Sequence, residues 1–291
     1  MNKGLKTLPI IAIVGETASG KSHLAMQIAQ QLDADILCAD ATTVYRGFDI
    51  GSAKPSGAEQ QLVQHYGIDI ADPSEVFTAA KYQAYAKEIL EKQAAVGRAT
   101  VLVGGSGLYI DSVLYDYSFA ESTADDALDD MSTEDLQQRV RELYGDTLLE
   151  QIDHHNPRRL MGVLRRGGVE PSRGPLLEGA SLIGLRIDRG QLESRIEERV
   201  DAMFLAGLEA EVSHLAQGYG WDVPAMQAIG YREFQPYIMG TATLAQVREQ
   251  IIIHTRQLAK KQRTWFNRNQ DITWVGSLEE AVDLVTTNLR N

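Results

Sequence analysis

Short apolar runs alternate along the chain with segments whose apolar residues recur every three or four positions. The runs at 10–14, 36–39, 100–103, 182–187 and 272–275 are short and rich in β-branched residues, which predicts buried strands. Because helical segments separate these runs, we expect an α/β fold with a mostly parallel sheet flanked by helices.

The helical segments show one apolar face each. A helix is expected directly after residue 20, and others at 79–93, 191–215 and 244–268. The apolar positions that we expect on their buried faces are Leu24, Ile28 and Leu32 in the first, Leu192, Ile196, Val200, Met203 and Phe204 in the third, and Val247, Ile251, Leu258 and Trp265 in the last.

The segment 116–180 has a different composition from the rest. Its first part, 116–135, holds eight acidic residues and no basic ones, and 156–173 holds five arginines against one acid. No strand pattern is visible, so we interpret 116–180 as a helical insertion into a core made of residues 1–115 and 181–291.

Composition narrows the class of protein. The 291 residues carry a net charge of −12, which argues against a general nucleic-acid binder, although 248–268 holds six bases against one acid and predicts a local basic surface. No apolar run approaches the roughly 18 residues of a membrane span. The single cysteine, Cys38, lies in an apolar run, is interpreted as a core residue, and fits a reducing cytoplasm. We expect a cytoplasmic monomer with no membrane contact.

The clearest chemical motif is the segment 15–22, which reads Gly-Glu-Thr-Ala-Ser-Gly-Lys-Ser. It fits the P-loop pattern and lies between a predicted strand and a predicted helix, as that motif requires. The glycines allow main-chain N–H groups to face a phosphate, Lys21 adds a positive charge, and the Ser22 hydroxyl is placed to hold Mg²⁺ or a phosphate oxygen. These features predict a P-loop NTPase-like core that binds a diphosphate.

Two further candidates end strands of the same predicted sheet. Asp40 follows the second strand and Gly104-Gly105 follow the third, so both are expected beside the loop at the carboxyl edge. A kinase of this class usually has a metal-holding carboxylate at the position of Gly104, which weakens a kinase interpretation. The glycines indicate either close approach to a ligand or a tight turn, and Asp40 is a general base, a metal ligand or a turn residue.

Arginines on predicted helix faces supply the positive charge. Arg199 shares a face with Ile196, Val200 and Met203, where a charge is unfavourable unless it meets an anion. We expect either Arg199 or Arg195 to bind the diphosphate and the other to pair with a glutamate.

Basic residues also recur along the last long helix. Arg256, Lys260 and Arg263 follow helical spacing there, which is typical of a solvated face, but the neighbouring Trp265 and Phe266 favour a nucleic-acid surface.

Several blocks in this order make the chain resemble the tRNA dimethylallyltransferase family over nearly its whole length. Besides the loop, they are residues 40–47 and 49–55, 103–109, 195–199 with 207–212, 229–233, and 255–262 followed by Thr264-Trp265. The resemblance implies transfer of a dimethylallyl group from dimethylallyl diphosphate to N6 of the adenosine 3′-adjacent to the anticodon of a tRNA.

The resemblance also implies roles for single residues. Asp40 would be the general base. Ser22, Arg199 and Mg²⁺ would stabilise the departing diphosphate, with Ser22 as the metal ligand. The residues implied in diphosphate binding are Gly15, Thr17, Ala18, Ser19, Gly20, Lys21 and Ser22. Those implied in binding the tRNA anticodon stem-loop are Asp40, Ala41, Thr42, Thr43, Ser106, Arg158, Arg159, Lys260 and Arg263, with the insertion gripping the anticodon arm.

Some residues depart from the family pattern. Glu16 stands where the family usually has proline, Ala41 and Thr43 replace a usual serine and glutamine, and 159–165 lacks an expected arginine and glutamate in an insertion that is shorter than usual. The alternatives are an adenine-nucleotide prenyltransferase that makes cytokinins, a small-molecule P-loop kinase, and a non-catalytic RNA binder. Glu16 has no explanation from the sequence.

Overall fold

Six strands of the described chain pair in parallel in the order β3-β2-β4-β1-β5-β6. Their bounds are β1 Ile10–Val14, β2 Asp35–Cys38, β3 His65–Tyr66, β4 Thr100–Val103, β5 Ala180–Leu185 and β6 Ile272–Val275. The mostly parallel α/β sheet predicted from the apolar runs is confirmed, and the short strand β3 was not predicted.

The computed structural model describes residues 9–119 and 125–288. Residues 1–8 and 289–291 of the predicted core, and 120–124 of the predicted insertion, lie outside the described residues. In the part of the chain that is described, no helix has the length and apolar character that crossing a membrane requires.

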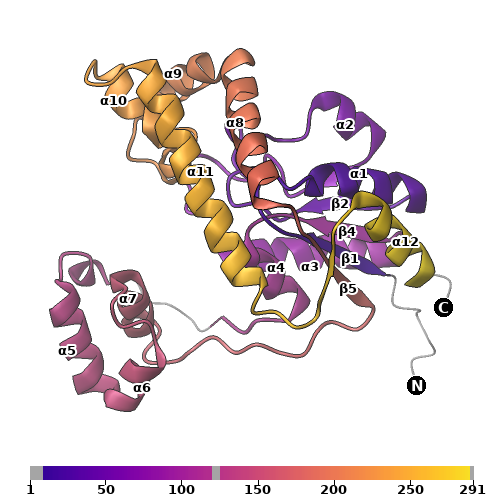
Figure 1. Ribbon diagram of the computed structural model, residues 1–291. Coiled ribbons are helices and arrows are strands. Elements are labelled where there is room, and N and C mark those ends of the chain that lie inside the picture. The colour runs from indigo at the N-terminus through magenta and orange to yellow at the C-terminus, as the bar shows by residue number, and fades with distance from the viewer. Residues whose placement is uncertain (1–8, 120–124, 289–291) are drawn as a thin grey trace, which may run out of the picture. The chain divides into compact units, whose positions relative to one another are not determined.

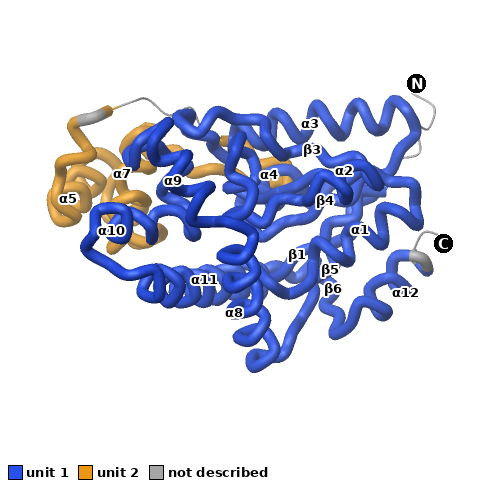
Figure 2. Tube along the Cα trace, turned by 90° about the horizontal axis from the view of Figure 1, so that it is seen from above, with its two compact units in different colours: residues 1–114, 176–291 blue, residues 115–175 orange. Residues whose placement is uncertain are grey.

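Helices cover both faces of the sheet (Figures 1 and 2). The helices outside residues 115–175 are α1 Lys21–Leu32, α2 Gly57–Leu62, α3 Ala79–Ala95, α4 Gly107–Leu114, α8 Arg189–Leu205, α9 Leu208–Tyr219, α10 Gln235–Ile238, α11 Leu244–Phe266 and α12 Leu278–Asn288, with short 3₁₀ turns η2 Pro224–Gln227 and η3 Arg232–Phe234. Of these, α9 and α10 lie away from the strands (Figure 1). Figure 2 shows α3 on the opposite side of the strands from α12.

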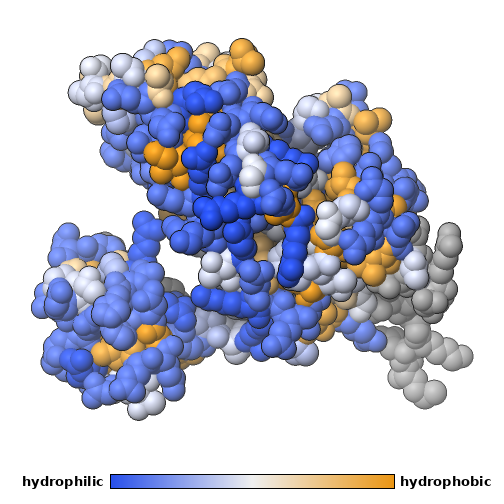
Figure 3. All heavy atoms as spheres, viewed as in Figure 1, coloured by the Kyte–Doolittle hydropathy of each residue, from blue (hydrophilic) through white to orange (hydrophobic). Residues whose placement is uncertain are grey.

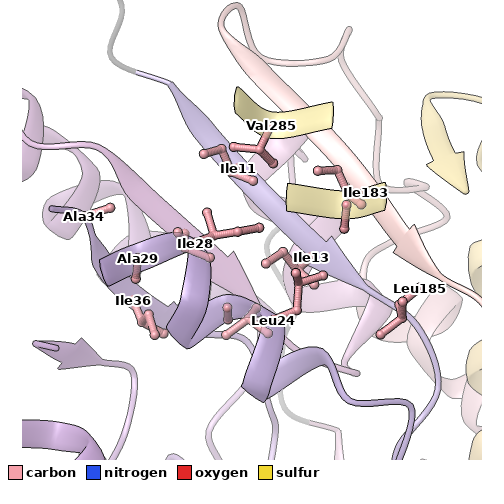
Figure 4. Close-up of a cluster of buried hydrophobic side chains, with 14 of the residues drawn as sticks. Ile11, Ile13, Leu24, Ile28, Ala29, Ala34, Ile36, Ile183, Leu185 and Val285 are labelled. Atoms are coloured by element: carbon pink, nitrogen blue, oxygen red, sulfur yellow. The ribbon is translucent and has the colours of Figure 1, made fainter. Parts of the chain in front are cut away.

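Alternating strand residues build the core beneath α1 and α12 (Figure 4). Ile11 and Ile13 of β1 point into this cluster, where Leu24 and Ile28 of α1 and Val285 of α12 meet them. Each such buried side chain stabilises the fold by about 1.5–3 kcal/mol relative to an exposed one. Because all five residues of β1 are buried, its sequence is a continuous apolar run.

The chain divides into two compact units, residues 1–114 with 176–291 and residues 115–175. The smaller unit holds η1 Asp126–Leu128, α5 Thr133–Tyr144, α6 Asp146–Gln151 and α7 Pro157–Arg165 around its own small core, which includes Leu136, Val140, Leu160 and Val163. Residue 180, the end of the predicted insertion, is the first residue of β5 in the larger unit.

The single helix predicted over 191–215 is wrong. The chain forms α8 and α9 instead, separated at Gly207, whose φ of 99° is left-handed and outside the helical range. Leu205, just before the break, is 90% exposed. The apolar periodicity continues across the break, which is why it suggested one helix.

The buried face predicted for α11 is only half right. Val247 and Ile251 are buried, but Leu258 and Trp265 are 36% and 38% exposed. A seven-residue spacing drifts by about 20° per heptad around a straight helix, so a line of such positions leaves the core. The other buried residues of α11 are Ile252, Thr255, Ala259, Gln262 and Phe266.

Candidate active site

The loop 15–20 connects β1 to α1 at the carboxyl edge of the sheet. Gly15 and Gly20 have φ of 143° and 101°, and Ala18 has φ of 61° although it carries a side chain. A Cβ on Gly15 would lie 3.0 Å from the Leu185 carbonyl oxygen, so this position also has little room. The loop therefore has a strained conformation that surrounding contacts must maintain.

Lys21 begins α1 and its side chain is buried. Its ammonium donates a hydrogen bond to the main-chain carbonyl of Glu16. Burial and the positive charge of Arg199 lower the pKa of Lys21 to about 7, while Asp40 and Glu16 act in the opposite direction. A buried ammonium beside a guanidinium is a poor arrangement by itself and a favourable one for a bound anion.

Arg199 and Arg195 lie on the side of α8 that faces the loop. The Arg195 guanidinium donates to the Ser19 carbonyl at 3.2 Å. Arg199 has no hydrogen bond or ion pair with any described residue, and burial lowers the pKa of its guanidinium while nearby Asp40 raises it. Among the described residues neither arginine pairs with a glutamate, so that prediction is wrong: Arg195 instead binds a main-chain carbonyl of the loop.

Asp40 lies close enough to Lys21 and Arg199 for its charge to raise the pKa of both groups. Its carboxylate Oδ1 accepts the Thr42 amide at 2.9 Å, and its main-chain carbonyl accepts the Thr43 hydroxyl at 3.4 Å. Asp40 is thus a turn residue by geometry, and it is also the carboxylate beside the two cations.

Ser106 and the glycines before it hold the segment after Asp40. The Ser106 hydroxyl accepts the Ala41 amide at 2.9 Å. A Cβ on Gly104 would lie 2.0 Å from the Ala39 carbonyl oxygen, and one on Gly105 would lie 2.1 Å from the Gln262 side chain. Close packing against the protein's own atoms, which neither the ligand explanation nor the turn explanation included, accounts for both glycines.

Glu16 forms an ion pair with Arg263 at the end of α11. Its Oε1 lies 2.9 Å from Nε and 2.7 Å from Nη2 of Arg263. The carboxylate that the sequence left unexplained is therefore neutralised by a residue 247 positions away.

Gln262 is a site residue that the sequence analysis missed. It is buried, accepts the Thr17 amide at 2.7 Å and donates to the Gly105 carbonyl at 3.1 Å. The sequence did contain an indication of this role, because Gln262 is a polar residue on the same helix face as the apolar Ala259 and Phe266. The same criterion, a polar side chain on an apolar face, identified Arg199.

The outer face of α11 carries the other predicted contacts. Lys260 is exposed and lies at a shallow cavity of about 450 Å³. Figure 3 shows hydrophilic residues over the lower part of the region where α11 lies and an apolar patch over its upper part. Trp265, 38% exposed, donates from Nε1 to Asp111 at 2.9 Å. Arg256, which the sequence placed at helical spacing with Lys260 and Arg263, pairs with Glu197 at 2.6 Å. The cavity is lined by Gln257, Lys260, Lys261, Thr264, Trp265 and Arg268.

Within the smaller unit, most arginines already have acidic partners. Arg159 and Arg166 pair with Glu170, and Arg165 pairs with Asp129. Arg158 is exposed and has no ion pair with a described residue. Arg158 is thus the arginine of α7 that a phosphate group could bind without displacing an acidic side chain.

The Ser22 hydroxyl is exposed at the start of α1 and has no partner among the described residues. Within those residues no group of three or more acidic, histidine or cysteine side chains could hold a metal. Mg²⁺ commonly binds through one or two protein oxygens and the oxygens of a substrate phosphate, and a single free hydroxyl beside a phosphate loop fits that pattern. The interpretation of Cys38 as a core residue is confirmed, because it is a free cysteine buried in the main hydrophobic cluster, and this burial raises the pKa of its thiol to about 12.

Comparison with known proteins adds independent information. Residues 43–270 match the family model described as IPP transferase. The chain is 38% identical to a tRNA dimethylallyltransferase of Picosynechococcus, over 96% of this chain and 99% of that protein, and 36% identical to one of Bacillus subtilis, over 91% and 90%. The solved structure of a tRNA isopentenylpyrophosphate transferase from Bacillus halodurans superposes with a TM-score of 0.76 at 30% identity and covers 97% of each chain.

Proposed function

Because this chain belongs to the IPP transferase family, we propose that it is a tRNA dimethylallyltransferase. It moves the dimethylallyl group of dimethylallyl diphosphate to N6 of the adenosine 3′-adjacent to a tRNA anticodon and releases diphosphate. The observation that carries this proposal is the pair of cations, the buried Lys21 and the partly buried Arg199, beside the loop and next to the carboxylate Asp40.

In the reaction the N6 nitrogen attacks the first carbon of the prenyl group, and the bond from that carbon to the diphosphate oxygen breaks. Asp40 takes the proton that N6 loses, and its neighbourhood supports this because a fixed carboxylate lies beside the cationic pocket. Negative charge develops on the leaving diphosphate, where Lys21 and Arg199 stabilise it. Atoms and charge balance without an oxidant or a further reactant.

The loop binds the diphosphate through main-chain amides at the N-terminus of α1. The residues proposed for this are Gly15, Thr17, Ala18, Ser19, Gly20, Lys21 and Ser22. The Ser19 hydroxyl is buried and has no partner within the described part of the chain, which supports a ligand at this position. The Thr17 and Ser19 amides are exceptions, since the Gln262 side chain and the Glu16 carbonyl already accept them.

Mg²⁺, when bound, adds positive charge on the diphosphate oxygens. Ser22 would hold it together with oxygens of the substrate.

The acceptor adenosine must leave its stack to reach Asp40. We assign the contacts around that base to Asp40 with Ala41, Thr42, Thr43 and Ser106, which form one hydrogen-bonded segment. The contacts to RNA phosphates are assigned to Lys260, Arg158 and Arg159. Arg159 must first leave Glu170, which makes Arg158 the stronger of the two.

The test is a transfer assay with labelled dimethylallyl diphosphate. An anticodon stem-loop with adenosine 3′ of the anticodon, AMP and ADP are offered separately as acceptors. Transfer to the stem-loop is expected, and transfer only to the free nucleotides would replace the proposal by cytokinin synthesis. Labelled ATP in a parallel reaction detects phosphoryl transfer, which would support a kinase instead.

A further inference from the structure

Two neighbouring residues at the end of α11 hold the diphosphate loop. Arg263 pairs with the Glu16 carboxylate, and Gln262 accepts the Thr17 amide. We propose that Arg263 is a positioning residue for diphosphate binding, acting through Glu16, and that it is not an RNA contact. This inference rests on the proposed function, since it assigns a role within the same site.

Glu16 is the residue on which several contacts of the loop depend. Its main-chain carbonyl accepts the Lys21 ammonium and the Ser19 amide, the latter at 3.3 Å. Its side chain is only 10% exposed. The orientation of this one peptide therefore sets where the Lys21 ammonium and the Ser19 amide lie, and the Arg263 ion pair fixes the side chain of the same residue.

The two partners of the pair differ in their access to water. Arg263 is 43% exposed, so its guanidinium is solvated even without Glu16. Glu16 is a buried residue of the loop itself, so without Arg263 its carboxylate has lost its neutralising partner. An unpaired buried carboxylate is unfavourable, and here it would also repel the diphosphate.

The strained loop gives this pair a further consequence. Ala18 has a φ of 61°, which a residue with a side chain rarely adopts. Such a conformation persists only where surrounding contacts determine it. The contacts that hold this loop are those of Arg263, Gln262 and Arg195.

The first experiment is Arg263→Gln in the full chain, with both KM values measured. We expect the KM for dimethylallyl diphosphate to rise about tenfold and the KM for the anticodon stem-loop to stay within about twofold. Arg263→Lys retains the charge and is expected to recover much of the loss. A rise confined to the stem-loop KM would make Arg263 an RNA contact and overturn the proposal.

The second experiment adds Glu16→Gln to Arg263→Gln. If the loss arises from the unpaired carboxylate, the double variant should recover to within about threefold of the unsubstituted protein. An additive or larger loss would overturn the proposal. Since the double variant contains no unpaired charge, it also serves as the informative protein if Arg263→Gln folds poorly.

Arg248→Gln is the matched control. Arg248 lies on the same helix and pairs with Asp201 of α8. Its substitution breaks an ion pair between helices without touching the loop, and both KM values should stay unchanged.

Binding of pyrophosphate, measured by calorimetry, separates this inference from the proposed function. The order of affinities across these variants should follow the diphosphate KM values. That order in a protein which transfers no prenyl group would leave the inference standing and remove the proposed function. Equal pyrophosphate affinity in Arg263→Gln and the unsubstituted protein would remove the inference alone.

Discussion

The side chain of Gln262 bridges Thr17 and Gly105, accepting the amide of one at 2.7 Å and donating to the carbonyl of the other at 3.1 Å. Thr17 follows β1 and Gly105 follows β4, which are neighbouring strands. One side chain from α11 thus joins two turns at the carboxyl edge of the sheet.

Gln262→Ala should lower the free energy of unfolding by about 2 kcal/mol, because it leaves a partly buried amide and a buried carbonyl without partners. Urea denaturation followed by circular dichroism measures this. Gln257→Ala, at an exposed position of the same helix, is the control and should change stability by less than about 0.5 kcal/mol. Equal stability of the two variants would show that water replaces the lost contacts.

Pyrophosphate affinity should fall as the pH rises above neutrality. The pKa of Lys21 is lowered to about 7 in the free protein, and a bound anion raises it, so binding takes up a proton in the range where the free amine is neutral. Affinity should weaken about tenfold from about pH 7 to about pH 8.5. Calorimetry in buffers of different ionisation enthalpy would detect the proton uptake.

The control for this pH dependence is Lys21→Arg, whose guanidinium stays charged. Any dependence that remains in that variant belongs to the ionisation of pyrophosphate itself. The same slope in both proteins would exclude Lys21 as the titrating group.

Asp40→Asn should lower the transfer rate by at least about 100-fold and leave pyrophosphate binding in place, because the amide oxygen can still accept the Thr42 amide but cannot take a proton. Single-turnover kinetics and calorimetry on the same preparation measure the two effects. Asp40→Ala also removes the turn hydrogen bond to the Thr42 amide, so the difference between the two variants measures how much of the loss comes from the turn. Undiminished transfer in Asp40→Asn would remove Asp40 from the role of base.

Affinity for the stem-loop should fall steeply with salt, because phosphate contacts release counterions. Lys260→Gln should weaken binding and reduce the slope of log affinity against log salt by about one. Lys92→Gln on α3, where the lysine pairs with Glu88, is the control and should leave the slope unchanged. A slope that Lys260→Gln does not alter would exclude this lysine as a phosphate contact.

The strands were predictable because parallel strands buried on both faces form short continuous apolar runs. The run at 100–103 coincides with β4, which is buried throughout, and the run at 272–275 coincides with the edge strand β6, which is buried only at Ile272 and Val275. Helix ends were less predictable, since the apolar period of α8 continues into α9 and only Gly207 marks the break. Predicting the buried face of α11 required the angular position of each residue around the helix axis. A seven-residue spacing gives this angle incorrectly, because it drifts around a straight helix.

The loop of the candidate site was predictable because its residues are contiguous. Its supports were not, since Arg195, Gln262 and Arg263 come from distant helices and reach the loop only in the folded chain. A buried polar residue on an apolar face indicates that a partner exists, but the sequence does not identify it. The partner of Glu16 had no local signal of any kind.

The burial of Cys38 makes this protein convenient for spectroscopy. Its thiol is enclosed in the sheet, and burial raises the pKa to about 12, so the reactive thiolate is scarce in the native state. Reagents that modify thiols should therefore leave the native chain unlabelled. A cysteine introduced at an exposed position would then accept a fluorophore selectively, without prior removal of the natural one.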